Sequence, residues 1–111
     1  MGTLNFEKII QESSAISKEI VGKAWKNLKP YAEHEFCQFA ENIEFLTQLK
    51  IKNQISDEEF KARIEIQRLS LKNVLLAIEG IGLITAQEVV NAVIGIVSKF
   101  VEEALHIAIL I

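Results

Sequence analysis

Three helix-start signals and one proline divide this chain into four segments of similar length. Asn5, Ser56 and Thr85 each precede a run with helical apolar spacing, and a side-chain oxygen at such a position accepts a hydrogen bond from the first helical turn. Ser56 and Thr85 are each followed three residues later by glutamate, which is the spacing of a capping box. Pro30 interrupts the first apolar run and is favoured at the first position of a new helix. The pattern predicts helices over residues 5–28, 30–52, 57–79 and 86–110.

The short connections between these four segments favour antiparallel neighbours. A chain of 111 residues fits one domain, and it is long enough to bury a modest core without disulfides or metals. We therefore expect residues 1–111 to form a single all-α domain, an antiparallel up-down-up-down four-helix bundle. An alternative arrangement makes the first two helices one bent rod, or exchanges them between two chains.

The fourth predicted helix carries more apolar residues than one buried face requires. Its polar residues form a single narrow strip, whereas a helix packed on one side needs only about a third to a half of its circumference to be apolar. One interpretation is that it fills the most buried groove of a monomer. The other is that it contacts a second copy of the chain or a different protein, and in a symmetric dimer the same surface would meet itself. The residues expected at this contact are Val93, Ile96, Val97, Phe100 and Val101.

The third predicted helix has a second apolar side. Ile66, Leu69 and Leu76 lie away from the residues with the spacing of its inner face. Glutamate at position 59 and arginine at position 63 stand four residues apart, as do Asp57 and Lys61, and such pairs stabilise a helix weakly. The residues expected on the inner face are Phe60, Ile64, Leu71, Leu75 and Ile78.

The net charge of −3 argues against a nucleic-acid partner, because binding to phosphates requires a basic face. Lys23, Lys26 and Lys29 recur every three residues just before Pro30. We interpret them as cations at the carboxyl end of the first helix, where the helix dipole favours positive charge. The alternative is a patch for phosphate or acidic lipid.

The connection between the third and fourth helices, residues 78–84, is apolar apart from Glu79. Water-soluble proteins that insert into membranes carry such hairpins, so a membrane-active or toxin-neutralising bundle is the alternative function. Against insertion, Glu79 and Glu88 flank the tip, and a carboxylate at the bilayer centre costs about 2.5–3.5 kcal/mol. The amino terminus lacks the basic start and apolar core of a signal peptide. We expect a cytoplasmic protein.

Two side-chain pairs could carry chemistry. Glu103 and His106 form the Glu-x-x-His motif of ferritin-like carboxylate sites, but the chain has one copy, so a metal site would need an oligomer. His34 and Cys37 stand three residues apart, as a thiolate nucleophile or half of a zinc site would require. The chain has no second cysteine, and Cys37 lies between two phenylalanines in the manner of a small core residue. We expect no catalytic residues, metal or cofactor. We expect a protein that acts through protein–protein contact rather than as an enzyme, and that forms a homo-oligomer through its fourth helix.

Overall fold

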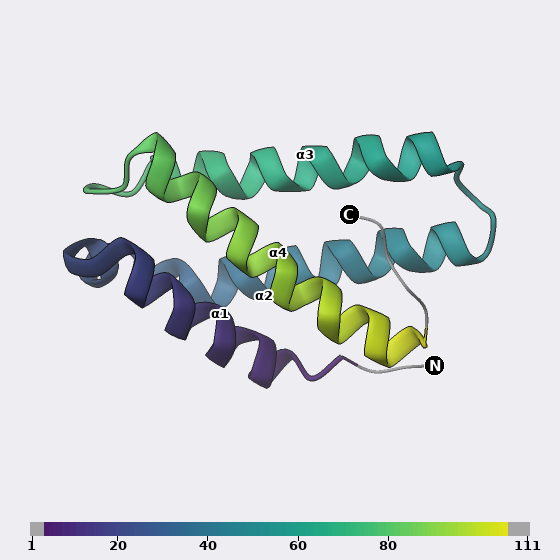
Figure 1. Cartoon of the computed structure of the whole chain (residues 1–111), viewed down its shortest axis with the longest axis horizontal. Coiled ribbons are helices and arrows are strands. Elements are labelled where there is room, and N and C mark those ends of the chain that lie inside the picture. The colour runs from purple at the N-terminus through teal and green to yellow at the C-terminus, as the bar shows by residue number, and fades with distance from the viewer. Residues whose placement is uncertain (1–3, 107–111) are drawn as a thin grey trace.

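A computed structural model describes residues 4–106 of the chain, and the secondary structure of these residues consists of helices alone, with no strand among them (Figure 1). This confirms the predicted all-α class. Residues 107–110 of the fourth predicted helix lie outside the described part. The elements are α1 (Phe6–Val21), the single 3₁₀ turn η1 (Gly22–Ala24), α2 (Trp25–Ile51), α3 (Asp57–Leu76) and α4 (Leu83–Leu105).

The corner between α1 and α2 lies at Gly22 and not, as predicted, at Pro30. Gly22 has φ 57° and ψ −120°, a backbone conformation that only glycine adopts without strain. The helix predicted over residues 5–28 therefore ends at Val21. Pro30 falls in the second turn of α2, where it deprives the Lys26 carbonyl of its helical donor. Both residues are exposed, so water can hydrogen-bond to that carbonyl and the helix continues.

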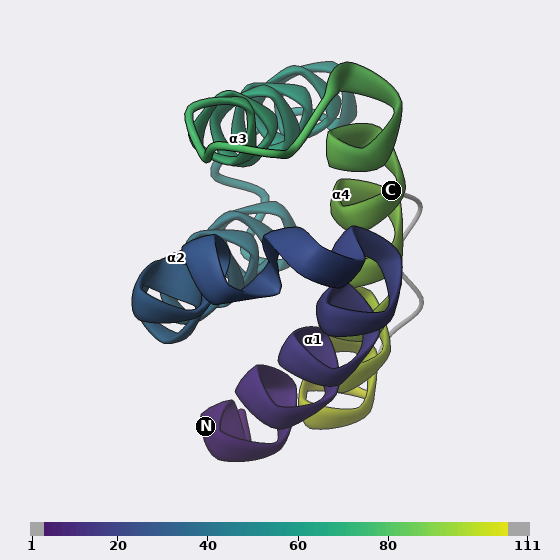
Figure 2. The ribbon, with the colours of Figure 1, turned by 90° about the vertical axis from the view of Figure 1, so that its left-hand side faces the viewer.

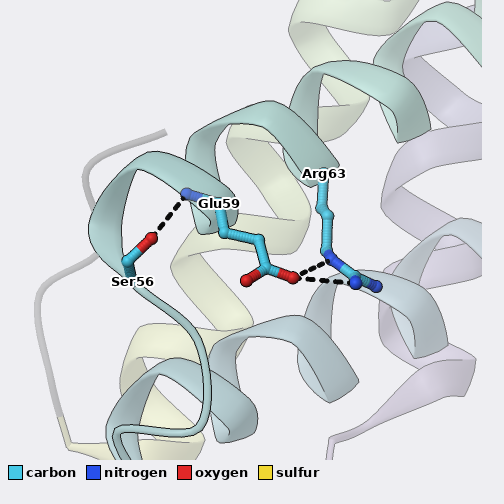
Figure 3. Close-up of polar contacts among 3 residues, drawn as sticks. All are labelled: Ser56, Glu59 and Arg63. Atoms are coloured by element: carbon cyan, nitrogen blue, oxygen red, sulfur yellow. Dashed lines mark hydrogen bonds and ion pairs between the residues drawn. The ribbon is translucent and has the colours of Figure 1, made fainter.

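The predicted caps of α1 and α3 are confirmed. The Asn5 side chain accepts a hydrogen bond from the backbone N–H of Lys8 at 3.1 Å. Ser56 Oγ accepts one from the backbone N–H of Glu59 at 3.0 Å (Figure 3). The Glu59 carboxylate points to the Arg63 guanidinium, with an N–O distance of 2.8 Å, so it forms the predicted ion pair (Figure 3).

The predicted cap of the fourth helix is wrong. α4 begins at Leu83, with Gly82 as its N-cap and no side-chain oxygen bonded to its first turn. Thr85 consequently lies inside the helix, in its first turn. The connection after α3 places Gly80 at φ 91°, and this turn brings the chain into α4 before Thr85 is reached.

The helices contact one another unequally. α1 and α2 fold back side by side, and α4 runs obliquely from the end of α3 towards the start of α1 (Figures 1 and 2). α4 contacts all three other helices, whereas α3 contacts α2 and α4 and makes no contact with α1 within residues 4–106. Among the α-helices, α1 likewise contacts only α2 and α4, so α1 and α3 are the two helices with the fewest neighbours among the described residues.

The core is one cluster to which every α-helix contributes. Its largest fully buried side chains include Phe36 and Ile43 of α2 and Phe60 and Leu75 of α3. α4 contributes a buried row of seven residues, one fewer than α2 has, so much of its apolar surface packs against its own chain. That row consists of Ala86, Val89, Val90, Val93, Ile94, Val97 and Val101.

Candidate interaction surface

Three of the five residues predicted to form a contact on the fourth helix are core residues in this structure. Val93, Val97 and Val101 have an exposed fraction of 0%. Ile96 and Phe100 are half-buried, and Phe100 packs against the core. A partner could reach only Ile96 and Phe100 of this set, so the excess of apolar residues on α4 is used mainly within the chain.

A row of exposed apolar side chains lies instead on α3. Ile66, Leu69 and Leu76 are 60%, 44% and 38% exposed. Ala62 and Asn73 are also exposed and continue the same row, since the five positions are spaced alternately by four and three residues. We call these five residues the outer stripe. At about 3.6 residues per turn, the outer stripe lies roughly opposite the buried face of α3.

The outer stripe has the spacing of a coiled-coil seam, in which apolar residues occupy the a and d positions of a heptad. Ile66 and Asn73 fall at a, and Ala62, Leu69 and Leu76 fall at d. A β-branched residue at a with leucine at d is typical of two-stranded coiled coils, and a single asparagine at a sets register and strand number. α3 therefore presents the side chains of a helix–helix interface on a face that no other described helix covers.

The sequence identified only part of this surface. Ile66, Leu69 and Leu76 were recognisable as a second apolar side, but Ala62 and Asn73 were missed because one is small and the other polar. The alternating four-three spacing was the signal that could have found both. Ile51 and Phe45 of α2 are exposed as well, yet they lie on another helix.

A groove of about 270 Å³ separates α3 from the first half of α4 and borders the outer stripe at Leu69. Arg68 crosses this groove and donates a hydrogen bond to Asn91 Oδ1 at 2.7 Å, and it pairs with Glu65 at 3.7 Å. Lys72 also lines the groove. Polar side chains thus flank the outer stripe on the side that faces α4.

The His34–Cys37 pair has the wrong electrostatics for nucleophilic chemistry. Both residues line an open depression on the surface of α2, with His34 exposed. Burial raises the pKa of the Cys37 thiol, and the negative charges of Glu41 and Glu33 raise it further. The thiol donates a hydrogen bond to Glu41 Oε1 at 3.9 Å. These neighbours keep Cys37 protonated, whereas a nucleophilic cysteine needs a thiolate.

Glu103 and His106 lie at the exposed end of α4. His106 is the C-cap residue and has φ 55°, the left-handed conformation common at helix ends. Within residues 4–106, no three histidine, cysteine, aspartate or glutamate side chains are grouped to hold a metal ion. One chain therefore brings no third ligand to this motif in its described part.

Two of the three lysines near the first corner lie at the opposite helix end from the one predicted. Lys23 belongs to η1, and Lys26 and Lys29 lie in the first turns of α2. The interpretation as cations at the carboxyl end of the first helix is wrong for Lys26 and Lys29, because the corner lies at Gly22, whereas Lys23 directly follows the C-cap of α1. All three are exposed, and the dipole at this end of α2 does not favour positive charge.

The connection between α3 and α4 is held against that corner. Asn27 Nδ2 donates a hydrogen bond to the backbone carbonyl of Glu79 at 2.9 Å, and Leu83 and Ile84 begin α4 with exposed side chains. By length and composition α4 could cross a membrane, and 39% of its most apolar window is buried inside the chain.

Comparison with protein-family models, with curated proteins and with solved structures found no match.

Proposed function

We propose that this protein acts through protein–protein contact and associates with a second copy of itself through the outer stripe of α3. The exposure of Ile66, Leu69 and Leu76 in one row carries this proposal. Scattered exposed apolar residues are normal, whereas a contiguous row is typical of an interaction site. The proposal keeps the self-association predicted from the sequence and moves its centre from α4 to α3.

The apolar burial available at the outer stripe supports only a weak dimer. Complete burial of a leucine or isoleucine side chain contributes about 1.5–3 kcal/mol, and the stripe residues are already partly covered by their own chain. Three such side chains from each copy contribute on the order of several kcal/mol. This gain is comparable with the free-energy cost of bringing two molecules together.

We also propose that the four helices form one up-down-up-down bundle with α4 as its oblique member. Two observations support it. Each connection reverses the direction of the chain (Figure 1), and helices adjacent in sequence contact each other while α4 closes onto α1. In this arrangement α3 contacts two other helices, as α1 does, and the exposure of Ile66, Leu69 and Leu76 leaves its outer side available to a partner.

The test is the mass in solution of matched variants. The wild-type chain is expected to show, by light scattering over a concentration series, a mass that rises from 12.5 kDa towards twice that value. Leu69→Glu is expected to remain at the mass of the monomer, because it buries a charge in the contact. Phe45→Glu is the matched control, since Phe45 is 59% exposed on α2 and lies off the stripe.

Three results would contradict the proposal. The wild-type chain could stay monomeric at every concentration, Phe45→Glu could dissociate the dimer, or Leu69→Glu could leave it intact. A dimer that dissociates only with Ile96→Glu would return the contact to α4. A wild-type monomer that binds anionic lipid vesicles, and loses that binding with Ile84→Glu, would support the membrane alternative instead.

A further inference from the structure

We infer that the second copy pairs with the outer stripe in parallel and in register, α3 against α3. This inference rests on the self-association proposed above and specifies its geometry. In this arrangement every stripe residue faces its own counterpart, so that Ile66 meets Ile66, Leu69 meets Leu69 and Leu76 meets Leu76. Within residues 62–76 apolar side chains then face only apolar side chains and Asn73 faces Asn73. Glu59, at the preceding a position, faces Glu59, and each of these carboxylates is paired with Arg63 of its own chain at 2.8 Å.

The antiparallel registers oppose unlike or repelling side chains. The most favourable one sets Glu65 of one copy beside Lys72 of the other, yet it places Leu76 against Glu59 of the acidic first turn of α3. A shift of one heptad in either direction brings Lys72 against Lys72 or Glu65 against Glu65. Because like charges directly opposite one another destabilise a helix pair, these shifted registers are disfavoured.

Asn73 supplies the register in the parallel arrangement. It is exposed and occupies an a position between Leu69 and Leu76. In a two-stranded parallel pair the two Asn73 amides face each other and can hydrogen-bond, whereas a parallel register shifted by one heptad would place an Asn73 amide against Ile66. The asparagine therefore favours two strands in register at some cost in affinity.

The flanking charges agree with the same register. In a parallel pair, a residue just before an a position faces the residue five positions later in the other helix. Glu58 of one copy then faces Arg63 of the second copy, on both sides of the seam, and both residues are exposed. Arg63 already holds Glu59 of its own chain at 2.8 Å, so its guanidinium is positioned at this edge. The other two flanking positions, Glu65 and Lys72, face the uncharged residues Ser70 and Ala77 of the second copy, so neither contact opposes like charges.

Parallel pairing also brings the two α3–α4 connections to the same end of the dimer. Leu83 and Ile84, at 54% and 74% exposure, stand at that end and follow the outer stripe in sequence. The hydrogen bond from Asn27 to the Glu79 carbonyl holds the connection in place. The exposed apolar residues of both copies are thus gathered at one end instead of being separated.

Disulfide cross-linking of the full chain tests the orientation. In a Cys37→Ser background, Ala62→Cys and Leu76→Cys each place one cysteine at an end of the stripe. A parallel in-register pair puts each cysteine beside its own counterpart. Under mild oxidation each variant is therefore expected to form a covalent dimer on the order of a hundredfold faster than the control Phe45→Cys, because pairing raises the effective thiol concentration.

The antiparallel arrangement gives a different result. In its most favourable register the two copies of position 62 are roughly 16 Å apart along the helix axis, at 1.5 Å per residue, which is too far for a disulfide. A dimer by light scattering in which neither variant cross-links faster than the control would overturn the parallel inference and leave self-association standing. If the uncross-linked background protein is monomeric, the proposed function itself fails.

A charge exchange provides a second readout. Arg63→Glu is expected to weaken the dimer, because Glu58 would then face a glutamate of the second copy. The double variant Glu58→Arg with Arg63→Glu is expected to recover most of the lost association, since the pair is restored with reversed signs. If the double variant is folded by circular dichroism but does not recover association, the in-register contact between Glu58 and Arg63 is contradicted.

Discussion

α3 and α4 use their apolar residues in opposite ways. α4 is the more apolar helix, yet beyond Leu83 and Ile84 in its first turn it exposes no large apolar side chain within its described length. α3 is more polar, and it exposes three large apolar side chains in a row. The number of apolar residues on a helix therefore does not indicate whether it has a free surface. The number of neighbours does not decide it either: α4 contacts three helices and α3 two, yet α2 also contacts three and exposes Tyr31, Phe45 and Ile51. What matters is which side of the helix its neighbours cover.

The strongest way to break this comparison is to place the same charge on each helix. Val97→Asp buries a carboxylate at a position with no exposure and is expected to cost more than about 4 kcal/mol of unfolding free energy, enough to unfold the chain. Ile66→Asp is expected to change the unfolding free energy of the monomer by only about 0.5 kcal/mol and to abolish the dimer. Urea denaturation followed by circular dichroism measures both. A folded, monomeric Val97→Asp variant would show that Val97 is an interface residue.

The next largest expected change in unfolding free energy comes from two buried serines on the side of α1 that packs against the other helices. Ser13 and Ser17 are fully buried, and their hydroxyls have no hydrogen-bond partner. A buried unsatisfied hydroxyl costs about 1–3 kcal/mol, so Ser13→Ala and Ser17→Ala are each expected to raise the unfolding free energy by about 1 kcal/mol. Ser14→Ala, at a half-buried neighbour, serves as the control. A loss of stability on removing either hydroxyl would mean that it bonds to a carbonyl one turn earlier.

The starts of α3 and α4 differ in side-chain capping, and the unfolding free energies of two alanine variants measure this difference. Ser56→Ala removes the hydroxyl that accepts from Glu59 and is expected to lower the unfolding free energy by about 1 kcal/mol. Thr85→Ala is expected to change it by less than about 0.5 kcal/mol, because Thr85 caps nothing. Thermal denaturation of the two variants checks the difference. Equal losses would place the start of α4 at Thr85, as its sequence pattern suggested.

The smallest effect is a gain at the start of α4. Gly82 has φ −90° and ψ 177°, which any residue can adopt, and a Cβ added there meets nothing within 4 Å. Gly82→Ser is expected to supply the missing cap and to raise the unfolding free energy by a few tenths of a kcal/mol. The measurement is the midpoint temperature of thermal unfolding. A lower midpoint would contradict the claim that the first turn of α4 has no side-chain cap.

Local sequence signals predicted where helices form better than they predicted where the chain turns between them. Asn5 and Ser56 were found from sequence because each cap depends on a bond between residues three apart. The first corner was misplaced because Pro30 is the stronger helix breaker in isolation, whereas the fold places the turn at Gly22 and leaves Pro30 on an exposed side of α2. That choice depends on contacts between distant helices, which local rules do not contain.

The surface was predictable only in part for a related reason. Val93 and Ile96 are equally apolar in sequence, and which of them is buried depends on the direction in which α4 crosses its neighbours. Ile66 and Leu69 were identifiable because the inner face of α3 was clear from spacing alone. An amphipathic helix at the edge of a fold can therefore be assigned a free face from sequence. A helix that is apolar on most sides cannot.

Methyl NMR with a soluble paramagnetic agent, at low and high protein concentration, tests the contrast between α3 and α4 most directly. At low concentration the methyl signals of Ile66 and Leu69 are expected to broaden while those of Val93 and Val97 stay sharp. At high concentration the α3 signals are expected to become protected, with those of the α4 valines unchanged. Protection that develops with concentration at the valines, while Ile66 and Leu69 remain broadened, would contradict the account.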